Sequence, residues 1–295
     1  MIEQKDWITN QRPNIVQKFE HVEFIAKKLI DRETAFKSFQ EGVFGYIIQA
    51  IWQNTPSKIL HHLVLRLCAT STKEELWFLI NEKEGRFGHR EFAMITRLKC
   101  DPIPNLDLKA LNKGDSFKDR FFPEAKKVRI EALKMFLNSP IQVSDEDMVR
   151  LANLYLLEIF FLAKSEHSLV DLKHLLIAND LQAFNDYPWG RVIFEETAQQ
   201  VINANRHAST AVTGYAMAGC AYALLAFAFE TIPALTKKNY TKRNDIQHLQ
   251  RLVNWVYVGN PHWQSLETNI FGAKNVSTNN FTYSALCLSL KSRQK

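Results

Sequence analysis

The sequence predicts a mainly α fold, a multi-helix globular bundle with one small β-hairpin. Apolar residues recur at helical spacing along most of the 295-residue chain. Residues 151–162 are apolar nearly all the way round, which predicts a central, buried helix. Only residues 76–87 show convincing strand chemistry. Apolar residues make up 46% of the chain and aromatic residues 12%, so we expect a sizeable core.

The first part of the chain is predicted to be helical after a loose leader at residues 1–13. Helical spacing predicts one helix over residues 15–30 and another over residues 36–52, interrupted by Gly42 and Gly45. Pro56 and Ser57 open the next helix, which continues to residue 67.

A β-hairpin is predicted next. Residues 76–80 are aromatic and apolar and form the first predicted strand. Residues 81–85 are polar and form the predicted turn, and Arg86 and Phe87 begin the returning strand. Gly88 then stands where a helix N-cap belongs, with Glu91 three residues later. This is half of a capping box, with glycine in place of the side-chain acceptor, and it predicts a helix that includes Phe92.

The second part is predicted as another helical block. Residues 101–123 are rich in Pro, Asn, Asp and Lys, so we expect a surface loop there. The helical domain over residues 14–270 is then one unit, or two lobes at residues 14–100 and 124–270. Ser144 and Asp147 form an S-x-x-D helix start. Further helices are predicted over residues 171–184, 192–206, 217–231 and 245–258, before a polar tail at residues 271–295.

Charge and cysteine usage disfavour several classes of protein. The net charge of +6 is spread over both halves, and the densest basic cluster, residues 118–129, has acidic residues interleaved. We interpret that cluster as a solvated helix face and not as a phosphate-binding patch. Cys68, Cys100, Cys220 and Cys287 are scattered, which is typical of free thiols in a reducing compartment. The N-terminal residues show no secretory signal.

Residues 208–229 carry no charge and are nominally long enough to cross a bilayer. Many of these residues are alanine, glycine, serine or threonine, which drive membrane insertion weakly. We therefore expect a buried helix here and no membrane span.

Residues 187–191, Tyr-Pro-Trp-Gly-Arg, predict a rigid aromatic corner that leads into a helix. Proline fixes its own φ, and Gly190 is expected to supply backbone angles that other residues avoid.

Glu158 lies within the apolar helix, where an unpaired carboxylate would be costly. We expect a buried ion pair between Glu158 and Arg191 that fixes helix register, in preference to a ligand or catalytic role.

The histidines and glycines do not form a complete metal or nucleotide site. His61 and His62 are adjacent, so they point in different directions from one helix. His167 and His174 could share a face, but no further ligand completes a set. We interpret these four as ordinary surface or capping histidines, and no phosphate-binding glycine loop is present.

Several of these segments together resemble a plant family known only as a domain of unknown function. The similarity spans roughly residues 39–271, and its specific parts are the Trp-Phe hairpin and the Tyr-Pro-Trp-Gly-Arg corner. The hairpin followed by a capped helix also resembles the related plant mobile domain. Gly88 departs from the family, which tends to have serine there, and the residues after Phe271 do not match.

Members of this family often lie N-terminal to ubiquitin-like-specific (SUMO-type) cysteine protease domains in proteins of Mutator-type transposable elements. The resemblance implies a plant, nuclear, transposon-derived protein with no assigned activity. It implies protein partners from the SUMO pathway or the transposon machinery.

A SUMO-type protease needs a cysteine, a histidine and an orienting acid. His262 and Trp263 resemble the histidine-tryptophan element of such proteases, and Cys287 lies downstream. However, no Asp follows His262, and Cys287 lacks the expected flanking Gln and Gly. We therefore expect the accompanying domain without the catalytic one.

The sequence thus predicts a non-enzymatic interaction module without catalytic, cofactor-binding or metal-binding residues. The alternatives are a truncated or degenerate ubiquitin-like-specific cysteine protease, and a DNA-binding transposon accessory protein that would need a contiguous positive surface. The residues nominated as a structural signature are Trp77, Phe78, Arg86, Phe87, Glu91, Phe92, Glu158, Tyr187, Pro188, Trp189, Gly190 and Arg191.

Overall fold

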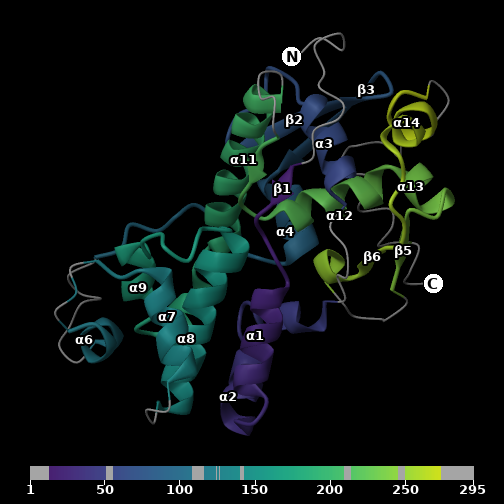
Figure 1. Cartoon of the computed structure of the whole chain (residues 1–295). Helices are drawn as coiled ribbons and strands as arrows, with labels where there is room; N and C mark the ends of the chain where they lie inside the picture. Colours follow the sequence, from purple (N-terminus) through teal and green to yellow (C-terminus); the bar gives the residue numbers. More distant parts are fainter. Residues whose placement is uncertain are drawn as a thin grey trace, which may run out of the picture.

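The fold is mainly α, as the sequence predicts (Figure 1). The computed structural model describes residues 13–50, 56–107, 116–123, 125, 127–139, 143–208, 214–244 and 250–273. The α-helices are α1 (Glu20–Leu29), α2 (Glu33–Glu41), α3 (Ser57–Leu65), α4 (His89–Thr96), α6 (Phe117–Phe121), α7 (Ile130–Asn138), α8 (Asp145–Leu156), α9 (Leu172–Ile177), α10 (Leu181–Asp186), α11 (Trp189–Ala208), α12 (Ala221–Thr231), α13 (Pro233–Lys237) and α14 (Trp263–Leu266). The 3₁₀ helices are η2 (Gly45–Gln49) and η4 (Arg251–Val253), and the π-helices are η3 (Leu157–Phe161) and η5 (Glu267–Phe271).

Two buried helices form the centre of the packing. α8 continues directly into η3, and residues 151–162 are buried throughout, which confirms the predicted central helix. α1, α2 and α7 pack against α8. α12 is buried almost completely and packs against α3 and α4, which α11 also contacts. Figure 1 shows α8 with α1, α2 and α7 below α12 with α3, α4 and α11. α13, α14, β5 and β6 lie at the side away from α6, α7 and α9.

The predicted start of α8 is confirmed. Ser144 is the N-cap, and its Oγ accepts a hydrogen bond of 3.1 Å from the backbone N–H of Asp147. The Asp147 carboxylate does not reach back to Ser144 but lies 2.6 Å from Arg120 and 2.7 Å from Arg150. This carboxylate therefore ties α8 to α6.

The predicted hairpin is confirmed, with a tighter turn than expected. The antiparallel strands β2 (Glu75–Ile80) and β3 (Lys83–Gly88) pair in continuous register from Glu75↔Gly88 to Ile80↔Lys83. Residues 83–85, predicted as turn, belong to β3. Asn81 and Glu82 alone make the turn, at φ of 53° and 64°, which is the conformation that matches the twist of a two-residue hairpin.

Two further pairs of strands were not predicted. β1 (Asn14–Ile15) lies parallel to β4 (Ala216–Met217), and β5 (Thr241–Arg243) lies antiparallel to β6 (Trp255–Tyr257). These strands are two or three residues long, so no alternating pattern marks them in the sequence. The helix predicted over residues 245–258 is wrong in its described part, which contains η4 and β6; residues 245–249 lie outside the described residues.

Other predicted helices have different boundaries. Residues 171–184 form two helices, α9 and α10, because Asp180 caps a new helix and accepts from the N–H groups of Gln182 and Ala183. α12 begins at Ala221 and not at Met217, because Gly219 at φ 75° breaks the path. The loop predicted over residues 101–123 contains the short helix α6, whose N-cap Ser116 accepts from the Asp119 N–H.

Some predictions fall on residues that the structure does not describe. These are residues 1–12 of the leader, residues 209–213 of the uncharged stretch and residues 274–295 of the tail. Within the described ranges, no helix combines the length and apolar character required of a membrane span.

Candidate functional site

The hairpin part of the signature is a polar network around Arg86. Strand alternation buries Phe78 and leaves Trp77 on the opposite face, half-buried. The Trp77 indole N–H donates to Glu75 at 3.0 Å, and Arg86 donates to Glu75 at 3.1 Å. These two donors hold the pKa of Glu75 below its ordinary value. Arg86 also lies 3.3 Å from Glu91.

The same Glu91 caps α4 as predicted. Its carboxylate accepts a hydrogen bond of 2.8 Å from the Gly88 backbone N–H, and Gly88 is the N-cap. Since Glu91 is buried, its contact with Arg86 joins the cap to the face of the hairpin. This part of the signature is a structural joint between strand and helix.

An aromatic cluster connects the hairpin to α11. The Phe87 and Phe92 rings each lie 5.6 Å from the Phe194 ring, between centroids, in edge-to-face geometry. The Phe227 ring of α12 lies 4.8 Å from that of Phe87. Segments far apart in the sequence therefore meet in one buried contact, where aromatic pairs add to simple burial.

At the predicted corner, residues 187–190 are buried and Arg191 is partly exposed. Trp189 is fully buried, and its indole N–H donates to the Phe184 carbonyl at 2.7 Å. The Tyr187 ring lies 4.5 Å from the Trp189 ring, and Pro188 is buried between these residues in the chain. Because the indole N–H is satisfied within the preceding helix, the turn from α10 into α11 is fixed.

Gly190 is required for a different reason from the one predicted. It lies in α11 and has ordinary helical geometry, so no special backbone angle is involved. A Cβ atom at this position would lie 2.6 Å from the Lys99 carbonyl oxygen, 2.7 Å from the Cys100 sulfur and 2.8 Å from the Leu98 carbonyl oxygen. Glycine is needed because the chain after α4 crosses α11 in direct contact.

The predicted ion pair between Glu158 and Arg191 is wrong. Arg191 donates to the carbonyl oxygens of Cys100 and Asp101, at 3.2 and 2.9 Å, and lies 3.2 Å from Glu195. Arg191 thus fastens the same crossing that Gly190 permits. Its side chain is held by Glu195 of its own helix and by the neighbouring carbonyls, and Glu158 is paired elsewhere.

Glu158 is fully buried, as predicted, with other partners. One carboxylate oxygen lies 2.7 Å from His174 Nδ1 and accepts a longer hydrogen bond of 3.4 Å from the Asp171 N–H. The other oxygen accepts from Lys164 Nζ at 2.6 Å. His174 is buried, so its interpretation as a surface or capping histidine is also wrong.

The chemistry available at Glu158 is that of an oriented imidazole. A carboxylate that holds one imidazole nitrogen is a common way to position a histidine for proton transfer. Here, however, the His174 ring stands edge-on to Trp189, 5.1 Å between centroids, and its side chain is only 9% exposed. Glu158 lies in η3, and π-helical turns often accompany functional sites. The enclosed geometry favours a structural role that ties η3 to α9.

A second buried cluster was missed by the sequence analysis. His62, on α3, is fully buried between two parallel rings, with centroids 3.6 Å from Trp263 and 4.5 Å from Phe271. Arg66 donates to both oxygens of Glu267, at 2.8 and 2.7 Å, and its other guanidinium nitrogen lies 3.2 Å from His62 Nδ1. We call His62, Arg66, Glu267, Trp263 and Phe271 the C-terminal latch.

The latch holds α14 and η5 against α3. Burial is the main cause that lowers the pKa of His62 to about 4, so the ring is neutral at physiological pH. His62 Nε2 is buried and has no hydrogen-bond partner among the described residues. The sequence offered one signal, two histidines inside an apolar helix, but the partners of His62 lie about 200 residues away and could not be located from spacing.

The other histidines differ from one another. His61 is buried, with Nδ1 2.9 Å from the Tyr215 hydroxyl, so it is not a surface residue. His167 is 78% exposed and pairs with Glu131, in agreement with its prediction. His262 is exposed, and its pairing with Cys287 stays untested because Cys287 lies outside the described residues. In the part of the chain that is described, no three His, Cys, Asp or Glu side chains are grouped as metal ligands would be.

Comparison with known proteins gives one match. Residues 64–200 match the family described as Domain of unknown function (DUF1985). The match covers a little under half of the chain and supports, at that level, the predicted resemblance to a domain-of-unknown-function family. No curated protein and no solved structure matches the chain.

The matched residues contain the whole structural signature, from Trp77 to Arg191, and the Glu158 cluster. They also contain Arg66 of the latch. Trp263, Glu267 and Phe271 lie outside the match, so the latch joins the matched segment to residues beyond it.

Proposed function

We propose that this chain is a non-enzymatic protein-interaction module of a plant, transposon-derived protein family. In longer relatives it would act in the nucleus beside SUMO-type cysteine proteases and place them, or the transposon machinery, on a protein partner. The match to a domain of unknown function supports the family at a coarse level. The setting comes from the resemblance of the hairpin and corner segments.

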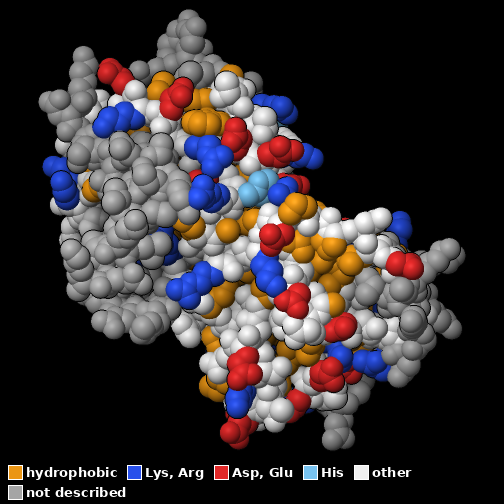
Figure 2. All heavy atoms as spheres, turned by 180° about the vertical axis from the view of Figure 1, so that it is seen from behind, with side chains coloured by type: hydrophobic (Ala, Val, Ile, Leu, Met, Phe, Trp, Pro, Cys, Tyr) orange, Lys and Arg blue, Asp and Glu red, His pale blue; other side chains and the backbone are white. Residues whose placement is uncertain are grey.

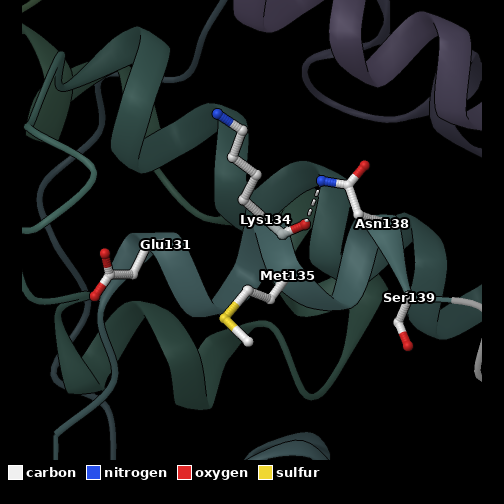
Figure 3. Close-up of a pocket in the computed structure, with 5 residues that line it drawn as sticks. All are labelled: Glu131, Lys134, Met135, Asn138 and Ser139. Atoms are coloured by element: carbon white, nitrogen blue, oxygen red, sulfur yellow. Dashed lines mark hydrogen bonds between the residues drawn. The ribbon is translucent and has the colours of Figure 1, made fainter.

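One observation carries the proposal, the exposed face of α7. Met135 is 71% exposed, although methionine is adaptable and usually buried. It lies in a shallow surface hollow with Glu131, Lys134, Asn138 and Ser139, which recur at helical spacing on one face of α7 and its C-cap (Figure 3). The Asn138 amide donates to the Lys134 carbonyl at 3.0 Å, so this face is ordered.

The surroundings of α7 support the same reading. Leu169 and Leu172 are 44% and 52% exposed, and the segment just before Leu169 is bonded to the start of α7 through the Ile130 N–H and the Ser168 carbonyl. Exposed flexible and apolar side chains beside ordered polar ones are typical of protein-binding surfaces. The buried charged groups Glu158 and Arg66 and the partly buried Glu267 are engaged with one another or with near neighbours, which favours a structural use for them.

The proposal is tested by capture from plant nuclear extract with the purified full chain, analysed by mass spectrometry with and without nuclease. We expect to capture a set of proteins that stays bound after nuclease treatment and includes SUMO-pathway or transposon proteins. The Met135→Glu variant should capture at least tenfold less of these proteins. Ile30→Glu is the matched control because Ile30, the C-cap of α1, is also exposed, at 64%. It should capture the same set as the original chain.

Equal capture by the original chain and Met135→Glu would contradict the α7 surface. A ubiquitin-like activity probe gives the second arm of the test. Labelling of the folded chain at Cys287 would contradict the non-enzymatic proposal and support the protease alternative, whereas an unlabelled, folded chain agrees with it.

A further inference from the structure

The turn between α13 and β5 concentrates positive charge. Lys237, Lys238, Lys242 and Arg243 fall within seven residues, and no Asp or Glu occurs between Glu230 and Asp245 in the sequence. The sequence analysis singled out residues 118–129 as the densest basic cluster and overlooked this shorter one.

The local fold gathers these side chains around one turn. The Tyr240 N–H donates to the Leu235 carbonyl at 3.0 Å, and the Asn239 N–H donates to the Thr236 carbonyl at 2.9 Å. Asn239 adopts φ 56°, which reverses the chain. The hydroxyl oxygens of Thr236 and Thr241 lie 3.2 Å apart, so the end of α13 and the start of β5 are side by side.

The lysine side chains of this turn are exposed. Lys237, Lys238 and Lys242 are exposed, and no described Asp or Glu lies within salt-bridge distance of their ammonium groups. Of the nearby carboxylates, Glu230 pairs with Arg251 at 3.0 Å and Glu267 pairs with Arg66.

The cluster at residues 118–129 differs in this respect. Lys118 lies 3.4 Å from Asp119, and Arg120 lies 2.6 Å from Asp147. On the face shown in Figure 2, positive and negative side chains are interspersed as well. At the α13–β5 turn, by contrast, Lys237, Lys238 and Lys242 have no described carboxylate within salt-bridge distance.

An ordered aromatic side chain lies among these cations. Tyr240 is partly exposed, and its hydroxyl group lies 2.8 Å from the Ser265 hydroxyl, which fixes the ring. The β6 strand supports the turn from behind, because Thr241 is buried and pairs with Tyr257. Arg243 lies over the Trp255 ring, 5.7 Å from its centroid. The cations are thus displayed on a rigid base.

We propose that this turn, the basic ribbon of Lys237, Lys238, Tyr240, Lys242 and Arg243, binds the sugar-phosphate backbone of a nucleic acid. Lysines act as point charges that neutralise phosphates and release counterions, without reading sequence. A fixed, partly exposed aromatic ring among cations suits stacking against a base or sugar. The site lies outside the α7 surface, so its failure would leave the proposed protein-interaction function unaffected.

The test is fluorescence anisotropy of a labelled 20-base-pair DNA duplex and a 20-nucleotide single strand, titrated with the full chain at several salt concentrations. The triple variant K237Q/K238Q/K242Q should bind at least tenfold more weakly at low salt. The slope of its plot of log K against log salt should be less negative by roughly 2 to 3, since each lost phosphate contact reduces the size of the slope by about 0.9. Circular dichroism checks that the variant is folded.

The matched control is K27Q/K37Q/K73Q, which removes the same charge from exposed lysines elsewhere. It should bind like the original chain. Equal weakening by both triple variants, or no binding by the original chain, would overturn the proposal. Lysine-dependent binding of polyglutamate as tight as that of the duplex would also overturn it, because the ribbon would then fit an acidic protein.

Discussion

The Glu158 cluster and the C-terminal latch both place a carboxylate beside a buried histidine and a cation, yet they differ in how far apart their members lie in the sequence. Glu158 meets His174 and Lys164, which lie within 16 residues of it in the chain. Glu267 meets Arg66 and His62 across about 200 residues. The first cluster fixes a local path, while the second fastens one segment of the chain to another.

The two histidines also differ in what surrounds them. The His174 Nδ1 atom contacts a fully buried carboxylate, and its ring meets one aromatic edge. The His62 ring is stacked between two aromatic faces, and its Nε2 has no partner among the described residues. A proton added to the buried His62 Nε2 would have no acceptor among the described residues. The surroundings of His62 therefore make the latch sensitive to acid.

The largest expected effect comes from removing the local carboxylate. Glu158→Ala leaves Lys164 and His174 without their buried acceptor, and breaking a buried pair on one side costs about 3–5 kcal/mol. We expect the free energy of unfolding, measured by urea denaturation, to fall by about that amount. Glu23→Ala removes an exposed carboxylate from α1 and should change the value by less than about 0.5 kcal/mol. A loss of under 1 kcal/mol for Glu158→Ala would show that the cluster contributes little.

The crossing at Gly190 comes second. Gly190→Ala would place a methyl group 2.6–2.8 Å from two carbonyl oxygens and a sulfur, so the chain after α4 must move away. Overpacking of this kind costs about 1–3 kcal/mol, measurable as a lowered midpoint of thermal unfolding. Gly259→Ala is the control, since a Cβ atom at that position would meet its nearest contacts at 3.6 Å or longer. If the two alanine variants were equally stable, the close crossing would not constrain the fold.

The smallest effect is expected at the cap of α4. Gly88→Ser supplies the side-chain acceptor that the half capping box lacks, while Glu91 keeps its bond to the backbone. Serine is better than glycine at an N-cap by only a few tenths of a kcal/mol. We therefore expect a slight rise in the free energy of unfolding by urea denaturation. The rise should vanish in Glu91→Ala if the two halves of the box act together, and a loss of stability would mean that Gly88 needs its own flexibility.

Several local signals in the sequence were reliable, although the helix predicted over residues 245–258 was wrong in its described part, and contacts between distant segments were not predicted. The cap at Gly88, the start of α8 at Ser144 and the buried helix at residues 151–162 follow from neighbouring residues, and the structure has all three. Strands of two or three residues leave no periodic pattern, so β1, β4, β5 and β6 could not be recognised.

The candidate sites show the same division. Burial of Glu158 was predictable because a carboxylate stands in an apolar helix. Its partner was not, because a rigid position for Arg191 says nothing about where the guanidinium points, and it points to the Cys100 and Asp101 carbonyls. The latch depends on Trp263, Glu267 and Phe271, which chain spacing does not relate to His62.

The latch makes a specific prediction about pH. The pKa of His62 is lowered to about 4 in the folded chain from 6.5, chiefly by burial, while Glu267 raises it and Arg66 and His61 lower it. Because the pKa of His62 is lower in the folded chain, the unfolded chain binds the proton more readily. The contribution of His62 to stability is therefore full above pH 6.5 and is lost as the pH falls from 6.5 toward 4. Between pH 7.5 and pH 5 the loss is about 2 kcal/mol.

The most direct measurement is hydrogen exchange followed by mass spectrometry on the full chain at pH 7.5 and pH 5.0, corrected for intrinsic exchange rates. We predict that the amides of residues 266–271 lose roughly 30-fold in protection at pH 5.0, since 1.4 kcal/mol is tenfold, while those of residues 157–162 keep theirs. His62→Phe, which keeps the stacking and removes the titrating group, should abolish the loss. Equal loss at both segments, no loss at either, or an unchanged loss in His62→Phe would contradict the account.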